Sequence, residues 1–244
     1  MYDLSGETAI VTGAAQGFGE GIAHRLGGAG ANVVVADVQV EKGEETVEDL
    51  REDGIGAEFV ECDVTDLGSV EAMVEAAMDR FDSVEILVNN AGGSGGETWP
   101  EIEPEAWHAG IDLNLHGPFN TAHVLTPHLL EHGNGRVVNI SSMAGKNVTV
   151  NGNPAYTSAK WGLIGLTKHM ARDLGPDVRV NAVCPGGSPN SPMGRWSTSE
   201  DIANGVHFLV AHESEYVHGE VLQVEGGGHL NPSAADLDLE LPEE

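Results

Sequence analysis

Tyr156 and Lys160 stand four residues apart at the start of a segment with helical spacing, Pro154–Leu174. Residues at this spacing share a helix face, so a phenol and an ammonium group would point into one cleft. A free tyrosine has a pKa of about 10, too high for efficient proton transfer near neutrality, and a nearby ammonium lowers it. A Tyr-x-x-x-Lys pair arises in this chain by chance about 0.05 times. The spacing predicts an acid–base pair, with a solvated helix pair as the alternative.

A glycine-rich turn, Thr12–Gly19, connects the first expected strand to the first expected helix. Its glycines allow a tight turn and let a pyrophosphate approach backbone N–H groups at the positive end of the helix. Because the chain has 33 glycines, three such positions coincide by chance about 0.6 times. The prediction of a dinucleotide site therefore depends on the position of this turn between a strand and a helix.

Asp37 ends the second expected strand. A carboxylate at this position accepts hydrogen bonds from the adenosine ribose hydroxyls and repels a 2′-phosphate. Neither Gln16 nor Val38 supplies a cation that would hold such a phosphate. The residue predicts NAD rather than NADP as cofactor, and a strand-end cap is the alternative interpretation of the carboxylate.

Two adjacent serines, Ser141 and Ser142, follow a strand-like segment that begins at Arg136. A hydroxyl at the carboxyl end of such a strand can donate a hydrogen bond to a substrate carbonyl in the crevice where α/β sheets bind ligands. Neighbouring residues on a strand face opposite ways. We expect one of the two serines to face the substrate.

Short apolar runs alternate with helical segments along the chain, and each is bounded by Gly, Asp or Asn. The expected strands are Thr8–Thr12, Asn32–Asp37, Ala57–Cys62, Val84–Asn89, Arg136–Ser141, Val178–Val183 and Glu220–Val224; the expected helices are Gly19–Ala29, Val40–Asp53, Ser69–Phe81, Pro104–His132, Pro154–Leu174 and Ser199–His212. This order predicts an α/β fold, a doubly wound seven-stranded parallel sheet with helices on both faces. We expect one domain over residues 1–232. The acidic tail that follows, residues 233–244, is expected to fray or to dock its leucines on a neighbouring subunit.

The charge and cysteine content exclude several classes of protein. Acidic residues number 39 against 11 Lys plus Arg, a formal net charge of −28, which disfavours binding to nucleic acids and membranes. No segment is apolar over the ~18 residues of a membrane span, and the amino terminus does not resemble a signal peptide. The two cysteines, Cys62 and Cys184, match no disulfide framework or metal site, and the pair His128 and His132 lacks further ligands. We expect a cytoplasmic protein without a metal.

Together these motifs resemble the short-chain dehydrogenase/reductase family, and the resemblance covers nearly the whole chain. Thr12–Gly19 is similar to the family's cofactor loop, and Tyr156 with Lys160 to its catalytic pair. The remaining matches, in order, are Asp63-Val64, Asn89-Asn90-Ala91-Gly92, Asn114-Leu115-His116-Gly117, Ser142, Pro185-Gly186 and Val224-Glu225-Gly226-Gly227. The family has a Rossmann fold, so the resemblance agrees with the fold predicted from the pattern.

The resemblance implies a role for each matching residue. Tyr156 would be the general acid in ketone reduction and the base in alcohol oxidation, while Lys160 would lower its pKa and bind the nicotinamide ribose. Ser142 would polarise the carbonyl oxygen, and Asn114 would hold a water that connects Lys160 to solvent. The cofactor-binding set would be Gly13, Gln16, Gly17, Phe18, Gly19, Asp37, Asp63, Val64, Asn90, Ala91, Gly92, Tyr156, Lys160, Pro185 and Gly186. The expected function is NAD-dependent interconversion of a small secondary alcohol and a ketone, by a homotetramer assembled through Pro104–His132, Pro154–Leu174 and the last strand.

The segment after Pro185-Gly186 departs from the family pattern. The family has a threonine near the position of Asn190 or Ser191 that contacts the nicotinamide carboxamide, followed by a helical lid of about two dozen residues. This chain reaches the next family landmark, resembled by Ser199–Ala203, about a dozen residues early. Two alternatives therefore stay open: an NAD-binding sensor or scaffold with weak or no turnover, and, among enzymes, a 3-oxoacyl thioester reductase. Trp196 and Met193 are candidates for an apolar substrate wall.

The acidic excess predicts a protein adapted to high salt, because salt screens the repulsion among carboxylates. We expect the free energy of unfolding to rise between dilute buffer and molar KCl, as measured by urea or thermal melts. Equal stability at the two KCl concentrations would contradict this.

Overall fold

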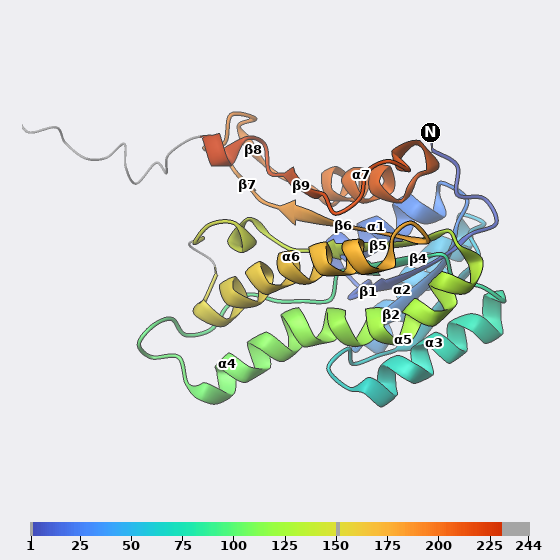
Figure 1. Cartoon of the computed structure of the whole chain (residues 1–244), viewed down its shortest axis with the longest axis horizontal. Coiled ribbons are helices and arrows are strands. Elements are labelled where there is room, and N and C mark those ends of the chain that lie inside the picture. Colours follow the sequence, from blue (N-terminus) through green and yellow to red (C-terminus); the bar gives the residue numbers. More distant parts are fainter. Residues whose placement is uncertain (1, 150–151, 231–244) are drawn as a thin grey trace, which may run out of the picture.

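Seven parallel strands form the central sheet of the computed structural model, which describes residues 2–149 and 152–230 (Figure 1). Their order across the sheet is β3-β2-β1-β4-β5-β6-β9. The bounds are β1 (Thr8–Thr12), β2 (Asn32–Asp37), β3 (Ala57–Glu61), β4 (Ile86–Asn89), β5 (Gly135–Ile140), β6 (Val178–Pro185) and β9 (Val221–Val224). The order reverses between β1 and β4, and in parallel sheets ligands bind beyond the carboxyl ends of the strands at this point.

Helices cover both faces of the sheet. The bounds are α1 (Gly17–Gly27), α2 (Val40–Glu52), α3 (Leu67–Phe81), α4 (Pro104–Ile111), α5 (Gly117–His132), α6 (Pro154–Leu174) and α7 (Ser199–Val210). One core cluster joins the sheet to α1, α2 and α7, and the other joins it to α3, α5 and α6. Within β1, Val11 packs in the first cluster and Ile10 in the second, because successive side chains of a strand face opposite ways. Strands β1 and β4 are mostly apolar and fully buried because helices cover both faces of the sheet.

The predicted fold is confirmed. The observed ends of the seven main strands lie within two residues of the predicted ones. No helix of the described residues is long and apolar enough to cross a membrane. Within the same residues no group of three His, Cys, Asp or Glu side chains is placed to hold a metal ion. The predicted tail, residues 233–244, lies outside the described residues.

The long predicted helix Pro104–His132 is interrupted, which the sequence pattern did not indicate. A five-residue π-helix, Asp112–His116, separates α4 from α5. Such turns insert about one residue into an α-helix and are frequent at functional sites. The apolar spacing on either side stays helical, so periodicity alone does not reveal the break. The π-helix carries Asn114, one of the predicted site residues.

A small hairpin occupies the segment after β6, where the sequence predicted no strands. Strand β7 (Gly187–Ser188) pairs antiparallel with β8 (Arg195–Trp196). Arg195 forms a bidentate ion pair with Asp201, and Asp201 completes a capping box with Thr198 at the start of α7. Two-residue strands are too short to produce an alternating pattern. The ion pair of Arg195 with Asp201 fastens the hairpin to α7. The hairpin lies in the segment where members of the family have a helical lid.

Candidate active site

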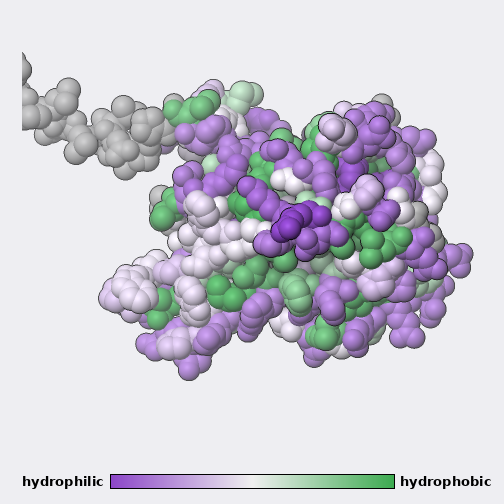
Figure 2. Space-filling model, viewed as in Figure 1, coloured by the Kyte–Doolittle hydropathy of each residue, from purple (hydrophilic) through white to green (hydrophobic). Residues whose placement is uncertain are grey.

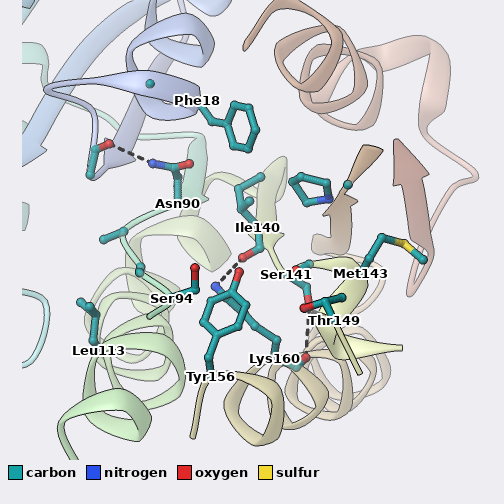
Figure 3. Close-up of a pocket in the computed structure, with 18 of the residues that line it drawn as sticks. Phe18, Asn90, Ser94, Leu113, Ile140, Ser141, Met143, Thr149, Tyr156 and Lys160 are labelled. Carbon is teal, nitrogen blue, oxygen red and sulfur yellow. Dashed lines mark hydrogen bonds between the residues drawn. The ribbon is translucent and has the colours of Figure 1, made fainter. Parts of the chain in front are cut away.

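A cavity of about 1220 Å³ lies along the carboxyl ends of the parallel strands (Figure 3). Of the predicted site residues, the structure brings the following to its wall: Gly13, Gln16, Gly17, Phe18, Asp37, Asp63, Val64, Asn90, Ala91, Gly92, Ser142, Tyr156, Lys160, Pro185 and Gly186. Gly19 and Asn114 are not among the described residues that line it. Residues that are far apart in the sequence thus meet at one site.

The glycine loop has the shape that a pyrophosphate needs. Gly13 and Gly17 adopt φ angles of +63° and +64°, a region that favours glycine. A Cβ on Gly19 would lie 2.1 Å from the carbonyl oxygen of Gly13, so this glycine lets α1 pack against the loop rather than touch a ligand. Among the described residues, Gln16 makes no side-chain cap at the start of α1. The first N–H groups of that helix therefore face the cavity end as hydrogen-bond donors for an anion.

Asp37 braces the glycine loop as well as lining the cavity. Its Oδ2 accepts the N–H of Ala15 at 3.0 Å, and its Oδ1 accepts the N–H of Gln39 at 3.0 Å. The side chain is 6% exposed. The strand-end cap considered from the sequence is therefore present, and the carboxylate still faces the cavity.

Lys42 is a cation near this end of the cavity that the sequence analysis missed. Its ammonium donates to Oε1 of Gln16 at 2.7 Å and to Oε1 of Gln39 at 2.8 Å. Both glutamines line the cavity. Lys42 lies inside α2, so its contact with Gln16 depends on how that helix packs beside the glycine loop.

Tyr156, Ser142 and Lys160 line the cavity where β5 ends and α6 begins. Figure 3 shows Tyr156 and Lys160 beside Ile140 and Ser141. The Lys160 ammonium donates to the carbonyl oxygen of Ile140 at 2.9 Å and lies 5.6 Å from the centroid of the Tyr156 ring. Burial lowers the pKa of Lys160 to about 8. The hydroxyl of Ser142 lies close enough to the Tyr156 phenol to lower the pKa of that phenol. The arrangement places a hydroxyl and a phenol together at the wall of the cavity.

The direction of the Tyr156 pKa shift differs from what the family resemblance implied. Desolvation raises the pKa of the phenol above its ordinary value, and the hydrogen bond from Ser142 lowers it by less. The ammonium of Lys160 is not among the causes of the shift. Its own lowered pKa leaves it partly uncharged in the range where the phenol titrates. Ser142 is the group that lowers the pKa of the phenol in this structure.

The two adjacent serines have different partners, as strand geometry predicts. Ser141 is 3% exposed and donates to the carbonyl oxygen of Lys160 at 3.0 Å. Ser142 accepts the N–H of Ala144 at 3.0 Å and contacts Tyr156. Both touch the cavity wall, and Ser142 is the one placed for proton chemistry.

Asn114 lies behind the cavity wall rather than on it. It is 1% exposed; its Oδ1 accepts the N–H of Gly93 at 3.1 Å, and its Nδ2 donates to the carbonyl oxygens of Gly93 and Gly110, each at 3.0 Å. A Cβ on Gly92 would lie 2.8 Å from Asn114 Oδ1 and 3.2 Å from Lys160 Nζ. Asn114 therefore holds the loop that passes beside Lys160. The water that the resemblance places on Asn114 stays a prediction.

The positions expected to replace the family threonine do not reach the cavity. Neither Asn190 nor Ser191 belongs to the described residues that line it. Ser191 is 6% exposed, and a Cβ on Gly226 would lie 2.9 Å from its Oγ. The hairpin instead brings Trp196 and Ser197 to the wall. Trp196 thus lies where an apolar substrate wall was expected, and the other candidate, Met193, does not line the described cavity.

Comparison with known proteins agrees with this geometry. A family model described as short chain dehydrogenase matches residues 7–201. The chain is 34% identical over 246 residues to the 3-oxoacyl-acyl-carrier-protein reductase FabG of Staphylococcus aureus (strain Mu50), covering 92% of this chain and 98% of that protein. It is 37% identical over 240 residues to the trans-4-hydroxycyclohexanecarboxylate dehydrogenase of Sinomonas cyclohexanicum, covering 91% and 92%. Among solved structures, a variant of the actinorhodin polyketide ketoreductase with NADPH superposes with a TM-score of 0.86 at 34% identity, covering 91% of this chain and 97% of that one.

The contact between Ser142 and Tyr156 predicts the titration of the phenol. In a protein whose other tyrosines, Tyr2 and Tyr216, are replaced by Phe, we expect Ser142→Ala to raise the Tyr156 pKa further, because the phenolate loses its donor. Ser158→Ala, at an exposed position of the same helix, is the matched control and should leave the pKa unchanged. The change in ultraviolet absorbance of tyrosinate with pH measures it. Equal pKa values in the two variants would contradict the role of Ser142.

Proposed function

The chain belongs to the short-chain dehydrogenase family, and from that premise we propose that Tyr156 is the acid and base of an enzyme that interconverts a secondary alcohol and a ketone. The observation that carries the proposal is that Ser142 and Tyr156 lie together at the wall of a cavity that the glycine loop also lines. The arrangement supplies a proton donor and an oxygen-binding hydroxyl at one place.

A nicotinamide dinucleotide, when bound, supplies hydride to a ketone or accepts hydride from an alcohol. The chain's own residues fit such a group, because the positive φ angles of Gly13 and Gly17 open the loop and the first turn of α1 offers N–H donors. Asp37 would hold the adenosine ribose. Asn90–Gly92 and Pro185-Gly186 form further parts of the same wall.

The proton steps follow from the contacts around Tyr156. In reduction, the hydroxyls of Ser142 and Tyr156 donate hydrogen bonds to the carbonyl oxygen, and the phenol then transfers its proton to the alkoxide oxygen. The phenolate that remains is stabilised by the Ser142 hydroxyl and by the positive charge of Lys160. Oxidation uses the reverse path, in which the phenolate accepts the alcohol proton. The position of Tyr156 at the cavity wall is what supports its role as acid and base. Its raised pKa keeps the phenol protonated near neutrality.

We propose NAD as the preferred cofactor, with Asp37 as the determinant. A buried carboxylate facing the ribose repels a 2′-phosphate. The related ketoreductase structure contains NADPH, and Lys42 places a cation beside the same part of the cavity. A preference for NAD over NADP therefore requires that Asp37 repels the 2′-phosphate more strongly than Lys42 attracts it.

A second candidate function is reduction of a 3-oxoacyl thioester. The name of the Staphylococcus aureus relative favours it. The net charge of −28 opposes it, because an acyl carrier protein is also acidic and like charges slow the encounter unless salt screens them. The relatives are named as reductases and dehydrogenases, which does not favour a sensor or scaffold without turnover.

We propose further that the protein is a cytoplasmic homotetramer with a salt-adapted acidic surface. Large apolar side chains on the expected assembly helices support association: Phe119 on α5 is 50% exposed and Trp161 on α6 is 53% exposed. Figure 2 shows that the visible surface is mostly hydrophilic, with apolar patches between the polar side chains. The acidic composition accounts for the hydrophilic part.

Tyr156→Phe tests the acid–base role. Removing the phenol oxygen should lower kcat for ketone reduction by about 10² to 10⁴, the contribution typical of general acid catalysis. Cofactor affinity, measured by NADH fluorescence, should stay nearly unchanged because the ring remains. Tyr216→Phe, at an exposed position, is the control and should retain full activity. Turnover that survives Tyr156→Phe would refute the role.

The pKa values predict the pH dependence of reduction. Reduction needs a protonated phenol and is assisted by a charged Lys160, whose pKa is lowered to about 8 by burial. Because the pKa of Tyr156 is raised, the phenol stays protonated through this range. We expect kcat/KM for reduction to fall as the pH rises through about 8, and kcat/KM for oxidation to keep rising as phenolate forms. A profile for reduction that is flat from pH 7 to 10 would contradict this.

Asp37→Ser tests the cofactor preference. Without the carboxylate, the like-charge repulsion of a 2′-phosphate disappears, and kcat/KM with NADPH should rise about tenfold or more. Adding Lys42→Met should remove much of that gain, because the nearby cation is lost. Lys42→Met alone is the control for the NADH reaction. An unchanged NADPH to NADH ratio in Asp37→Ser would rule out Asp37 as the determinant.

A further inference from the structure

The loop Gly92–Gly96 forms part of the cavity wall without belonging to a helix or a strand. It contributes Ser94, which Figure 3 shows among the residues around the cavity. Four of its five residues are glycines, and two of these, Gly95 and Gly96, have φ angles of +124° and +92°. Because glycine has little conformational preference, contacts from other elements must set the path of this loop.

Two buried asparagines hold the loop on either side of Ser94. Asn114 of the π-helix holds Gly93 by the two hydrogen bonds described above. Asn153, which is 8% exposed, donates from its Nδ2 to the carbonyl oxygen of Gly95 at 2.6 Å. Ser94 therefore lies between two fixed points of the backbone.

The side chain of Asn153 also caps the helix that carries Tyr156. Its Oδ1 accepts the backbone N–H of Tyr156 at 2.8 Å, which is the N-cap contact of α6. An amide oxygen only accepts hydrogen bonds and an amide nitrogen only donates them, so a reversed side chain would lose both contacts. One side chain of fixed orientation thus connects Gly95 with Tyr156.

The support that Asn153 gives to Tyr156 differs from that given by the strand end. Lys160 and Ser141 fasten α6 to the end of β5, and neither contacts the loop by a hydrogen bond. Among the hydrogen bonds of residues 2–149 and 152–230, the one from Asn153 to Gly95 is the one that joins the loop to α6. The relation between the loop wall and Tyr156 therefore depends on this amide.

We propose that Asn153 is a positioning residue of the active site, whose amide holds the loop wall at Ser94 and the turn of Tyr156 in one fixed relation. This rests on the proposed function only for the role of Tyr156. The amide oxygen keeps the phenol at its depth in the wall, and the amide nitrogen keeps the loop against which the substrate binds.

Two substitutions separate the two halves of the contact. Asn153→Ser keeps an oxygen that caps the N–H of Tyr156 but is too short to reach Gly95, whereas Asn153→Ala removes both hydrogen bonds. Asp66→Ala is the matched control, because the Asp66 side chain caps α3 in the same way and is not among the described residues that line the cavity. Melting temperatures show whether the loss of either cap lowers stability to a similar extent.

Two measurements on the free protein need no turnover. With Tyr2 and Tyr216 replaced by Phe, Asn153→Ala should lower the Tyr156 pKa toward its ordinary value, because a loosened turn exposes the phenol to water. Asn153→Ser and Asp66→Ala should leave that pKa unchanged. Hydrogen exchange of residues 92–98 should become about tenfold faster in both Asn153 variants, which release one of the two loop contacts, and should not change in Asp66→Ala.

Kinetics with cyclohexanone and NADH distinguish loop release from misplacement of Tyr156. Asn153→Ser should raise KM for the ketone about fivefold with kcat unchanged, the size of effect expected for one lost hydrogen bond. Asn153→Ala should raise KM and also lower kcat, because the phenol no longer keeps its place. Asp66→Ala should retain both constants.

An Asn153→Ala protein with the wild-type Tyr156 pKa, or an Asn153→Ser protein with wild-type loop exchange and KM, would overturn the proposal. Changes of equal size in Asp66→Ala would reduce Asn153 to an ordinary helix cap and overturn it as well. The proposed function fails separately, through turnover that survives Tyr156→Phe. The titration and the exchange experiment decide the role of Asn153 whatever the outcome of that test.

Discussion

The buried ammonium of Lys160 is the contact on which the arrangement of the active site depends. The side chain is 3% exposed, and its Nζ donates to the carbonyl oxygen of Ile140 at the end of β5. Ser141 donates in turn to the carbonyl oxygen of Lys160. These two hydrogen bonds fasten the first turns of α6 to the strand end and so bring Tyr156 to Ser142. A buried ammonium is costly unless it is hydrogen-bonded, and this one lowers its cost by donating to a backbone carbonyl that the strand end leaves open.

Lysines gather near the cavity, whereas none of its described lining residues is an arginine. The chain has only four lysines, and three of them lie at or beside it. Lys42 is held by two glutamines at the ribose end, Lys160 lies under Tyr156, and Lys146 donates to Gln223, which lies beside His229 of the cavity wall. A surface with a net charge of −28 repels the anions that a dehydrogenase must bind. Keeping the few ammonium groups near the cavity resolves that conflict locally while the rest of the surface stays acidic.

Local irregularities in the backbone stand at the same site. The π-helix contains Asn114, which hydrogen-bonds to Gly93, and the β7–β8 hairpin carries Trp196 to the cavity. The π-helix interrupts a segment that the sequence pattern predicts as one long helix. The hairpin lies where members of the family have a lid. Departures from regular geometry concentrate at functional sites because a binding surface needs positions that regular elements do not offer. Here they position a loop beside Lys160 and close one side of the substrate space.

The sequence by itself determined the parallel sheet, the glycine loop and the Tyr156–Lys160 pair, because each depends on neighbours within a few residues or on a strand and the helix after it. Only the tertiary structure decided that Asn114 and Gly19 lie behind the wall, and that Lys42 and His229 stand beside the cavity. It also decided the direction of the Tyr156 pKa shift, which depends on burial rather than on spacing. The physical reason is that these features arise from contacts between separate elements, such as Lys42 with Gln16, whose distance is set by packing of the helices on the sheet.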